Sequence, residues 1–293
     1  MGSRTKIDWC DASWNPVTGC LHDCEYCYAR RIAERFGARE IYDPECQCQR
    51  HLIERGMLTG TGKPLELDYP WEQKNKDGSI TNAAYPFGFS PTFHRYRLDE
   101  PQSWKKPRSI FVCSMADLFG YWVPDEWIAE VLKACDAAPQ HRYLFLTKAP
   151  SRYEKISSLM PSWEEMYLEK SRPVMMFGAS ATDDAMMAVA HKSNAEWVSV
   201  EPILEPIEPE WFISASGSNG DYSTFRRWEW VVIGAETGNS KHKTVPKREW
   251  VEEIVKVCKE YGTPVFMKDS LRDLMRDGFR QEFPWIVGGS ELF

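Results

Sequence analysis

The sequence lacks several features that would assign it to familiar protein classes. None of its 293 residues fall in a run of 18 apolar residues, so no transmembrane helix is predicted. The N-terminus lacks the apolar core of a secretory signal peptide. No Gly-x-Gly-x-x-Gly run follows the first predicted strand, which disfavours a dinucleotide-binding sheet. These absences predict a cytoplasmic protein with no membrane partner.

Positive charge is also scarce. The chain has 36 Lys and Arg against 43 Asp and Glu, a net charge of −7. This balance disfavours indiscriminate nucleic-acid binding through a globally positive field. Basic residues instead gather in short stretches. These stretches are typical of solvated loops, but they could also hold a phosphate-bearing substrate. These stretches are 95–97, 105–108 and 240–248.

Cysteine, in contrast, is plentiful. Nine cysteines without a secretory signal favour metal or catalytic roles over a disulfide framework. Cys20, Cys24 and Cys27 lie in "TGCLHDCEYCYAR", at a C-x3-C-x2-C spacing. Three thiolates are one fewer than a closed tetrahedral zinc or iron–sulfur site needs. The spacing alone leaves open a cluster with one free iron or a zinc site completed elsewhere. Donors for the latter are Cys10, His22, Cys46, Cys48 and His51.

Short apolar runs alternate with amphipathic segments along the chain. Each run is nearly continuous and rich in β-branched or aromatic residues, as in parallel strands buried on both faces. The runs are 108–114, 142–148, 173–180, 196–202, 229–236 and 264–270. Helical patterns occupy 28–37, 125–137, 151–159, 182–191 and 247–261.

With two further short strands, at 14–17 and 89–96, the pattern gives eight βα units. This count predicts a (β/α)8 TIM-type barrel, complete or partial, as a single domain over 1–293. An open doubly wound sheet is the alternative. Two polar segments interrupt the alternation of predicted strands and helices, near 38–86 and 205–227. The first is too long for a plain loop and predicts a lid-like insertion after the first βα unit.

Polar side chains follow the predicted strands at the points where they end. Because active sites of βα barrels lie at the carboxyl ends of the strands, this arrangement predicts a lined pocket. Glu201 and Lys268 directly follow apolar runs, so each needs a partner or a ligand. The polar residues at strand ends are Ser114, Asp117, Thr147, Lys148, Ser180, Asp183, Ser199, Glu201, Glu236, Lys268 and Asp269.

A C-x3-C-x-aromatic-C motif, with Tyr26 as the aromatic, on the first loop of a βα barrel resembles the radical S-adenosylmethionine (SAM) superfamily. Further blocks narrow the resemblance to a three-Cys-motif radical SAM family of phages and bacteria, distantly similar to spore photoproduct lyase. The resemblance runs from about residue 6 to 269. The blocks are "IDWCDASWNPVTGC", "YPFGFSPTFHRYRL", "FVCSMADLFG", "FLTKAP", "VSVEPI", "VVIGAETG" and "PVFMKD".

The resemblance implies that Cys20, Cys24 and Cys27 bind a [4Fe–4S] cluster whose fourth iron is open to SAM. One electron, from a donor such as flavodoxin or ferredoxin, then cleaves SAM to methionine and a 5′-deoxyadenosyl radical. Tyr26 is expected near the adenine. The other candidate SAM-binding residues, chosen by their position at strand ends, are Ser114, Lys148, Ser180 and Glu201.

The chain also departs from the superfamily. No Gly-Gly-Glu run, which many members use to bind the SAM amine, follows the second strand, and "GAETG" at 234–238 lies on a late strand instead. Cys113, at a strand end, is either a hydrogen donor to a substrate radical or a buried core residue. Cys46, Cys48 and His51 could form a second metal site or belong to a plain lid. His242 is a candidate for facing the substrate.

The substrate is the least constrained part of this interpretation. The phage setting, the similarity to photoproduct lyase and the local basic stretches favour a nucleobase, in a nucleic acid or a free nucleotide. A peptide or a small metabolite is the alternative for an enzyme. A non-enzymatic alternative is a zinc or iron–sulfur module that binds nucleic acid or a partner protein.

Overall fold

The structure is a computed structural model that describes residues 5–37, 41–42, 65–159, 173–215, 224–237, 243–287 and 290–291. The chain divides into two compact units. Unit 1 comprises Met1–Thr5, Cys10–Tyr143 and Ser157–Val174, and unit 2 comprises Lys6–Trp9, Leu144–Ile156 and Met175–Phe293. The prediction of one domain with two insertions stays a prediction.

The principal sheet has seven strands in the order β1-β8-β9-β10-β11-β14-β15. The registers β1–β8, β10–β11, β11–β14 and β14–β15 are all parallel. The strands are β1 (Ala12–Trp14), β8 (Ser109–Val112), β9 (Arg142–Thr147), β10 (Val174–Ala181), β11 (Trp197–Val200), β14 (Trp230–Ile233) and β15 (Val265–Met267). The six apolar runs are therefore confirmed as strands, and the fold is mixed α/β with a parallel sheet, consistent with a partial TIM-type barrel.

The strand predicted at 89–96 is present, but it is not an eighth strand of the principal sheet. This segment forms β7 (Thr92–His94), in a separate sheet of order β2-β7-β4 with β2 (Val17–Thr18) and β4 (Leu65–Leu67). β7 pairs antiparallel with β2, and the buried His94 ring accepts or donates a 2.8 Å hydrogen bond with Thr18 Oγ1. Both edges of this three-residue strand are thus already paired, and its Phe93 ring stacks on Trp127. The strand predicted at 14–17 is also divided, into β1 and β2.

Part of the predicted insertion after the first helix lies outside the described residues. Its described part contributes β4 to the sheet above and a small antiparallel sheet of β3 (Ile41–Tyr42), β5 (Glu72–Lys74) and β6 (Ile80–Asn82). The second insertion contributes the β12 (Ile213–Ala215) and β13 (Thr224–Arg226) ribbon. The role of the first insertion as a lid stays a prediction.

The helices follow the sequence signals for their ends. α6 (Asp184–His191) begins after Asp183, whose carboxylate accepts a hydrogen bond from Met186 N as an N-cap. α3 (Asp125–Asp136) starts after Pro124 with acidic residues in its first turn. The other helices are α1 (Tyr28–Phe36), α4 (Ile156–Leu159), α7 (Arg248–Glu260) and α8 (Arg272–Met275). No helix of the described chain is long and apolar enough to cross a membrane.

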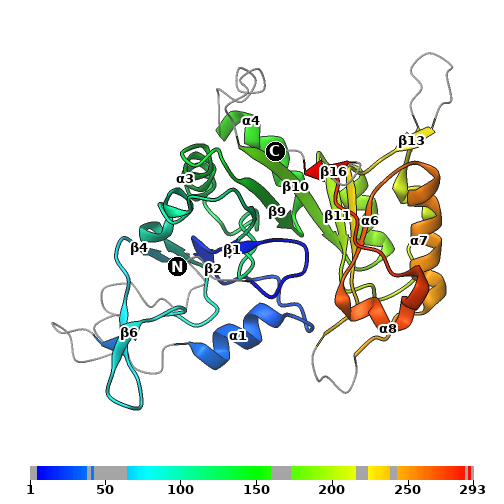
Figure 1. The fold of residues 1–293 in the computed structure, drawn as a ribbon. Coiled ribbons are helices and arrows are strands. Elements are labelled where there is room, and N and C mark those ends of the chain that lie inside the picture. Colours follow the sequence, from blue (N-terminus) through cyan, green and yellow to red (C-terminus); the bar gives the residue numbers. More distant parts are fainter. Residues whose placement is uncertain are drawn as a thin grey trace. The chain divides into compact units, whose positions relative to one another are not determined.

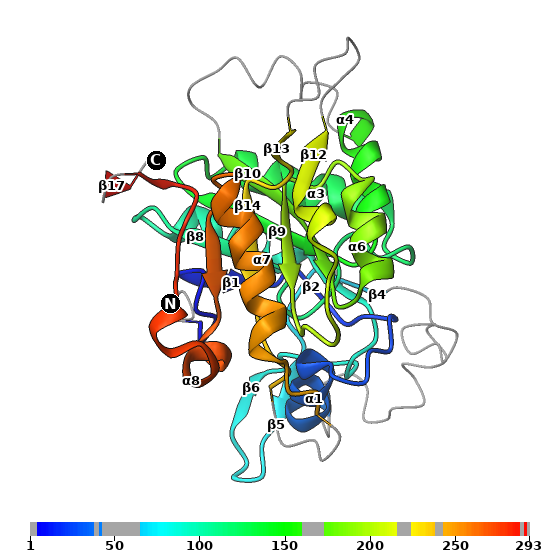
Figure 2. The ribbon, with the colours of Figure 1, turned by 90° about the vertical axis from the view of Figure 1, so that its right-hand side faces the viewer.

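In each unit the helices bury a narrow apolar stripe. In unit 1, α1 follows the loop that carries Cys20, Cys24 and Cys27 (Figure 1). It buries Ala29 and Ala33. In unit 2, α7 lies over the strands and buries Val251, Ile254 and Cys258 (Figure 2). The core of unit 2 is rich in indoles, with Trp9, Trp197 and Trp230 in edge or tilted contact. These stripes and rings exclude water from the apolar faces of the strands.

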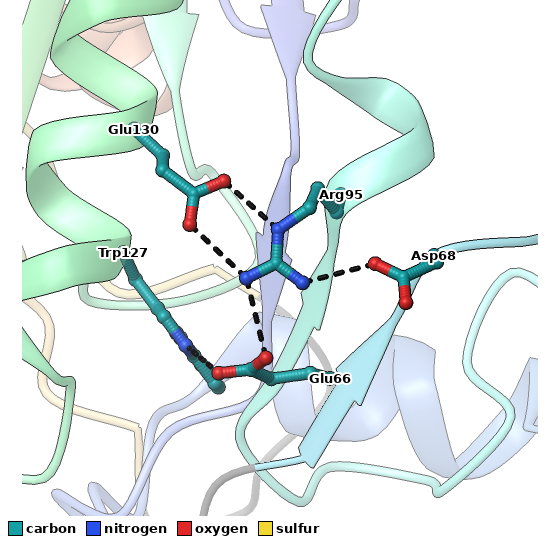
Figure 3. A network of polar contacts seen from close by, with 5 residues as sticks. All are labelled: Glu66, Asp68, Arg95, Trp127 and Glu130. Carbon is teal, nitrogen blue, oxygen red and sulfur yellow. Dashed lines mark hydrogen bonds and ion pairs between the residues drawn. The ribbon is translucent and has the colours of Figure 1, made fainter.

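An arginine with three carboxylate partners joins separate elements of unit 1 (Figure 3). Arg95 lies 2.8 Å from a Glu130 oxygen, 3.0 Å from Asp68 and 3.2 Å from Glu66. Glu66 also accepts a 2.6 Å hydrogen bond from Trp127 Nε1. The hydrogen bonds, first the one with Glu130, raise the pKa of Arg95. The network ties β4 and the segment after β7 to α3.

We predict that Arg95→Met lowers the free energy of unfolding by about 1 to 2 kcal/mol, because it leaves the carboxylates of Glu66, Asp68 and Glu130 without their shared cation. The control is Arg272→Met. Arg272 also covers an aromatic ring but pairs with one exposed carboxylate, that of Asp269. The control should change stability by about 0.5 kcal/mol or less. Urea unfolding measures both variants, and equal losses would contradict a stabilising role for the network.

Candidate functional site

The segment Ser114–Asp117, which follows β8 and Cys113, holds the loop that carries the three cysteines; we call it the anchor segment. Gly19 N donates to Met115 O at 2.9 Å, and Gly19 forms a parallel bridge with Ala116. The Tyr28 hydroxyl, at the start of α1, donates to Ser114 O at 2.6 Å. Both ends of the cysteine loop are thereby attached to the anchor segment.

Asn15 fixes the anchor segment against β1. Its Oδ1 accepts hydrogen bonds from Met115 N at 2.9 Å and from Ser114 Oγ at 3.2 Å. Arg97 in turn donates to Asn15 O at 3.0 Å. The Asn15 amide, which lies between β1 and β2, therefore holds the chain that follows β8 in place.

His22 and Asp117 form a second attachment between the loop and the anchor segment. His22 Nε2 and Asp117 Oδ2 lie 2.7 Å apart, and the other carboxylate oxygen accepts a hydrogen bond from Phe119 N. The Asp117 side chain is 8% exposed, and the His22 ring is in edge contact with Trp122. A buried carboxylate needs such partners, so this pair restrains the loop beside Cys20 and Cys24.

The cysteine loop runs from β2 to α1. Its Gly19 has a φ of 85°, and Asp23 has a φ of 56°. Cys27 N donates to Cys24 O at 3.1 Å, which closes a turn across the C-x2-C step. Cys27 is the N-cap of α1, and its Sγ accepts from Arg30 N at 3.3 Å. The Cys27 sulfur therefore lies at the N-terminal end of α1.

Burial dominates the electrostatics of Cys20. It raises the pKa of the Cys20 thiol from 9.0 to about 12, against a lowering by a hydrogen bond from the backbone of His22. Asp117, Cys24 and Cys27 raise it further, so these groups are near enough for their charges to act on Cys20. A thiolate here needs a nearby positive charge, which a bound metal supplies.

Across the described residues, no group of three or more His, Cys, Asp and Glu side chains is arranged to hold a metal ion. Cys46, Cys48 and His51, the predicted second metal site, lie outside the described residues, as does His242. Cys10 is described and is partly buried.

Among the other predicted site residues of unit 1, Ser114 belongs to the anchor segment and is partly buried. Tyr26 lies between Cys24 and Cys27, is partly buried, and its carbonyl accepts from Arg31. Cys113 is 2% exposed and has a φ of 59°, in the region that glycine prefers. Burial raises the pKa of its thiol to about 12. Cys113 is thus a buried thiol at a strained turn directly before the anchor segment.

The remaining predicted residues lie in unit 2. Lys148, after β9, donates to Ser180 Oγ on β10 at 3.2 Å. Glu201, after β11, forms a 2.5 Å ion pair with Lys268, after β15. Glu201 and Lys268, for each of which the sequence predicts a partner or a ligand, therefore pair with each other. Both lie at carboxyl ends of parallel strands, as expected.

Sequence reasoning missed Asn15, Gly19 and Gly234. Asn15 directly precedes a proline and Gly19 directly precedes the first cysteine, so turn chemistry could have identified both. At Gly19 a Cβ would overlap Ser90 O, so the loop can pass there only without a side chain. Gly234 follows the apolar run of β14, but only the structure shows that Glu201 and Lys268 meet over it.

The family model described as "Protein of unknown function (DUF5131)" matches residues 4–273. The chain belongs to the DUF5131 family. No curated protein matches it.

Two similar solved structures are variants of spore photoproduct lyase. A singly substituted variant has 8% identity and a TM-score of 0.45. A doubly substituted variant with bound AdoMet and dinucleoside spore photoproduct has 10% identity and a TM-score of 0.43. In both cases the similarity covers 91% of this DUF5131 chain and 78% of the other chain. At these scores, neither structure bears on what this chain binds.

We predict that Gly19→Ala is far more damaging than Gly262→Ala. Both glycines have positive φ, 85° and 69°, but only at Gly19 does a Cβ meet backbone atoms. Each alanine incurs about 1 to 2 kcal/mol for its left-handed conformation. Gly19→Ala should lower the free energy of unfolding by about 2 kcal/mol more than that, since Ser90 must move. Urea unfolding of both variants tests this, and equal losses would show that the loop tolerates displacement.

Proposed function

We propose that this chain is a radical SAM enzyme, in which Cys20, Cys24 and Cys27 bind a [4Fe–4S] cluster. The observation that carries the proposal is the cysteine loop itself. Three thiols at a C-x3-C-x2-C spacing lie on the loop after β2, and the anchor segment fixes that loop at both ends. Three protein thiolates leave one iron of a cubic cluster free for a small molecule.

The three thiols of the cysteine loop fit a [4Fe–4S] cluster. Each thiolate of a cubic cluster binds a different iron, so the three sulfurs need not surround one ion. Burial disfavours a bare thiolate at Cys20, and a cationic iron centre offsets that penalty. Cys27 presents its sulfur at the N-terminal end of α1. When bound, the cluster would supply the electron that cleaves SAM to methionine and a 5′-deoxyadenosyl radical.

The residues of the chain position the cofactors. Asn15 and Asp117 hold the loop in place, through Met115 N and His22 respectively. Tyr26 and Ser114 are the candidates in unit 1 for contact with SAM. In unit 2 the candidates are Lys148, Ser180 and Glu201, each at or just after the carboxyl end of a strand. A flavodoxin or ferredoxin is proposed as the electron donor, and the cytoplasm as the location.

The proposed substrate is a nucleobase, in a nucleic acid or a free nucleotide. Its support is the sequence resemblance to the three-Cys-motif family and the local basic stretches, in a chain whose overall charge is negative. Cys113 is the candidate hydrogen donor, and its raised pKa keeps the thiol in the S–H form that donates a hydrogen atom. The corresponding proposal for a peptide or metabolite substrate keeps the cysteines and SAM unchanged.

The test begins with metal content after anaerobic purification. We predict about four irons per wild-type chain, the number in one cubic cluster. Cys24→Ala should lose most of this iron, because two thiolates do not retain the cluster. Cys258→Ala is the matched control: Cys258 is a buried residue of α7, so its variant should keep wild-type iron. Iron and zinc are measured together by elemental analysis.

Activity is then measured without knowledge of the substrate. The reduced wild-type chain and Cys258→Ala should convert SAM to 5′-deoxyadenosine, and Cys24→Ala should not. A chain that carries stoichiometric zinc and no iron would overturn the proposal. Equal iron in Cys24→Ala and Cys258→Ala would place the cluster on other cysteines.

A further inference from the structure

Exposed apolar side chains gather beside the three cysteines of unit 1. Of the eleven large apolar side chains that are exposed in the described part of the chain, four lie between residues 21 and 36. They are Leu21, Tyr28, Ile32 and Phe36, with exposed fractions of 46%, 43%, 36% and 54%. Single exposed apolar residues are normal on a protein surface, but a contiguous patch of them indicates an interaction site.

Three of these side chains lie in a row along α1. Tyr28, Ile32 and Phe36 are spaced four residues apart, so they share one face of the helix; we call them the α1 stripe. The helix packs on the rest of unit 1 through another face, since its buried residues are Ala29 and Ala33. The core of unit 1 therefore does not account for the apolar character of the α1 stripe.

The α1 stripe begins where the cysteine loop ends. Cys27 is the N-cap of α1, and Tyr28 follows it directly. The Tyr28 hydroxyl donates to Ser114 O at 2.6 Å, so the anchor segment that fixes the loop also fixes the first residue of the stripe. Ile32 lies five residues after Cys27, which is about 7.5 Å along the helix axis at about 1.5 Å per residue. A protein seated on the α1 stripe would therefore lie beside the cysteines.

The charged residues of α1 are mostly basic. Three of its four charged residues are arginines, in a chain with a net charge of −7. Arg30 and Arg31 lie in the first turn, which has no acidic residue, although the helix dipole disfavours positive charge there. Arg30 pairs with Asp23 at 3.0 Å. Arg35, in contrast, is exposed beside the Phe36 ring and has no carboxylate partner among the described residues. The α1 stripe is thus bordered by positive charge, which favours an acidic partner.

We propose that the α1 stripe, with Arg35 at its border, is the docking surface for an acidic electron-carrier protein. The inference rests on the proposed function, because an iron–sulfur cluster on the cysteine loop needs an electron. The carrier loses one electron and the cluster gains it, and no bond forms or breaks at the docking surface.

The form of the surface suits such a carrier. Electron transfer slows steeply with distance, so the carrier has to dock beside the thiolates. Interfaces of electron carriers are small, typically below about 1,200 Å². An apolar centre within a polar rim is the usual anatomy of a protein interface, and complementary charges steer the partner to it. The α1 stripe provides the centre, and Arg35 provides part of the rim.

Direct binding of the carrier to the anaerobically purified full chain is the first measurement. Oxidised flavodoxin and oxidised ferredoxin, two acidic electron carriers, are titrated into the chain by calorimetry at low and high salt. Ile32→Ser/Phe36→Ser removes the apolar centre, and Arg35→Glu reverses the charge at the rim. Arg35→Lys keeps that charge and should restore binding.

Two matched controls lie in unit 2. Val189→Ser removes an apolar side chain that is 52% exposed on α6. Lys259→Glu reverses an exposed charge in the last turn of α7, as Arg35→Glu does in the last turn of α1, so both variants oppose the helix dipole equally. Neither control should change carrier binding.

We expect at least one carrier to bind the wild type, more weakly at high salt. Arg35→Glu and the double serine variant should each weaken this binding about tenfold or more. The rate at which the reduced carrier reduces the cluster should fall in the same variants. Dithionite is a small reductant that needs no docking surface, so it should reduce the wild type and all variants at equal rates. Equal rates with dithionite also show that the variants are folded.

Each other outcome decides a different claim. If dithionite reduces the cluster but neither carrier binds, or the α1 variants bind as the controls do, this inference fails and the proposed function stands. If the wild type is a dimer that the double serine variant separates, a second copy of the chain covers the α1 stripe, and the inference again fails alone. If the wild type holds no iron, both are overturned.

Discussion

The position of the three cysteines depends on the hydrogen bonds between the cysteine loop and the anchor segment after β8. Met115 O accepts from Gly19 N before the first cysteine, and Ser114 O accepts from Tyr28 after the last. Between them, Asp117 holds His22. A loop of this composition has no apolar core to fix it, so its order comes from these polar attachments and from the parallel strand that places their acceptors. Loss of the anchor segment would leave three thiols on an unrestrained loop.

Cys113 and Cys20 are both thiols whose pKa is raised by burial, but their surroundings differ. Cys113 immediately precedes the anchor segment and is buried, with its pKa raised to about 12. Cys20 is also disfavoured as a thiolate, but it has neighbours that could share a metal. The two thiols therefore differ although their pKa values are raised to a similar extent. Cys113 keeps its proton, whereas Cys20 can replace its proton with a bond to iron.

The sequence was a good guide to the strands of the principal sheet and a poor guide to the sheet outside it. Continuous apolar runs such as 229–236 can only be buried on both faces, so β14 and its neighbours were predictable. The segment 89–96 has no such apolar run, and its strand β7 pairs with the short β2 and β4; pairing partners leave no mark in a single sequence. The cysteine motif was also predictable, because its residues, like those of each apolar run, lie close together in the sequence. The crossing of Glu201 and Lys268 over Gly234 was not, since it involves three strand ends distant in sequence.

The proposed function depends on whether the three cysteines leave an iron open to SAM. Electron paramagnetic resonance of the anaerobically reduced chain, recorded with and without SAM, measures this directly. We expect the signal of a reduced [4Fe–4S] cluster that changes when SAM is added and does not change with 5′-methylthioadenosine. A cluster signal that is indifferent to SAM, or a chain that binds zinc and gives no signal, would contradict it.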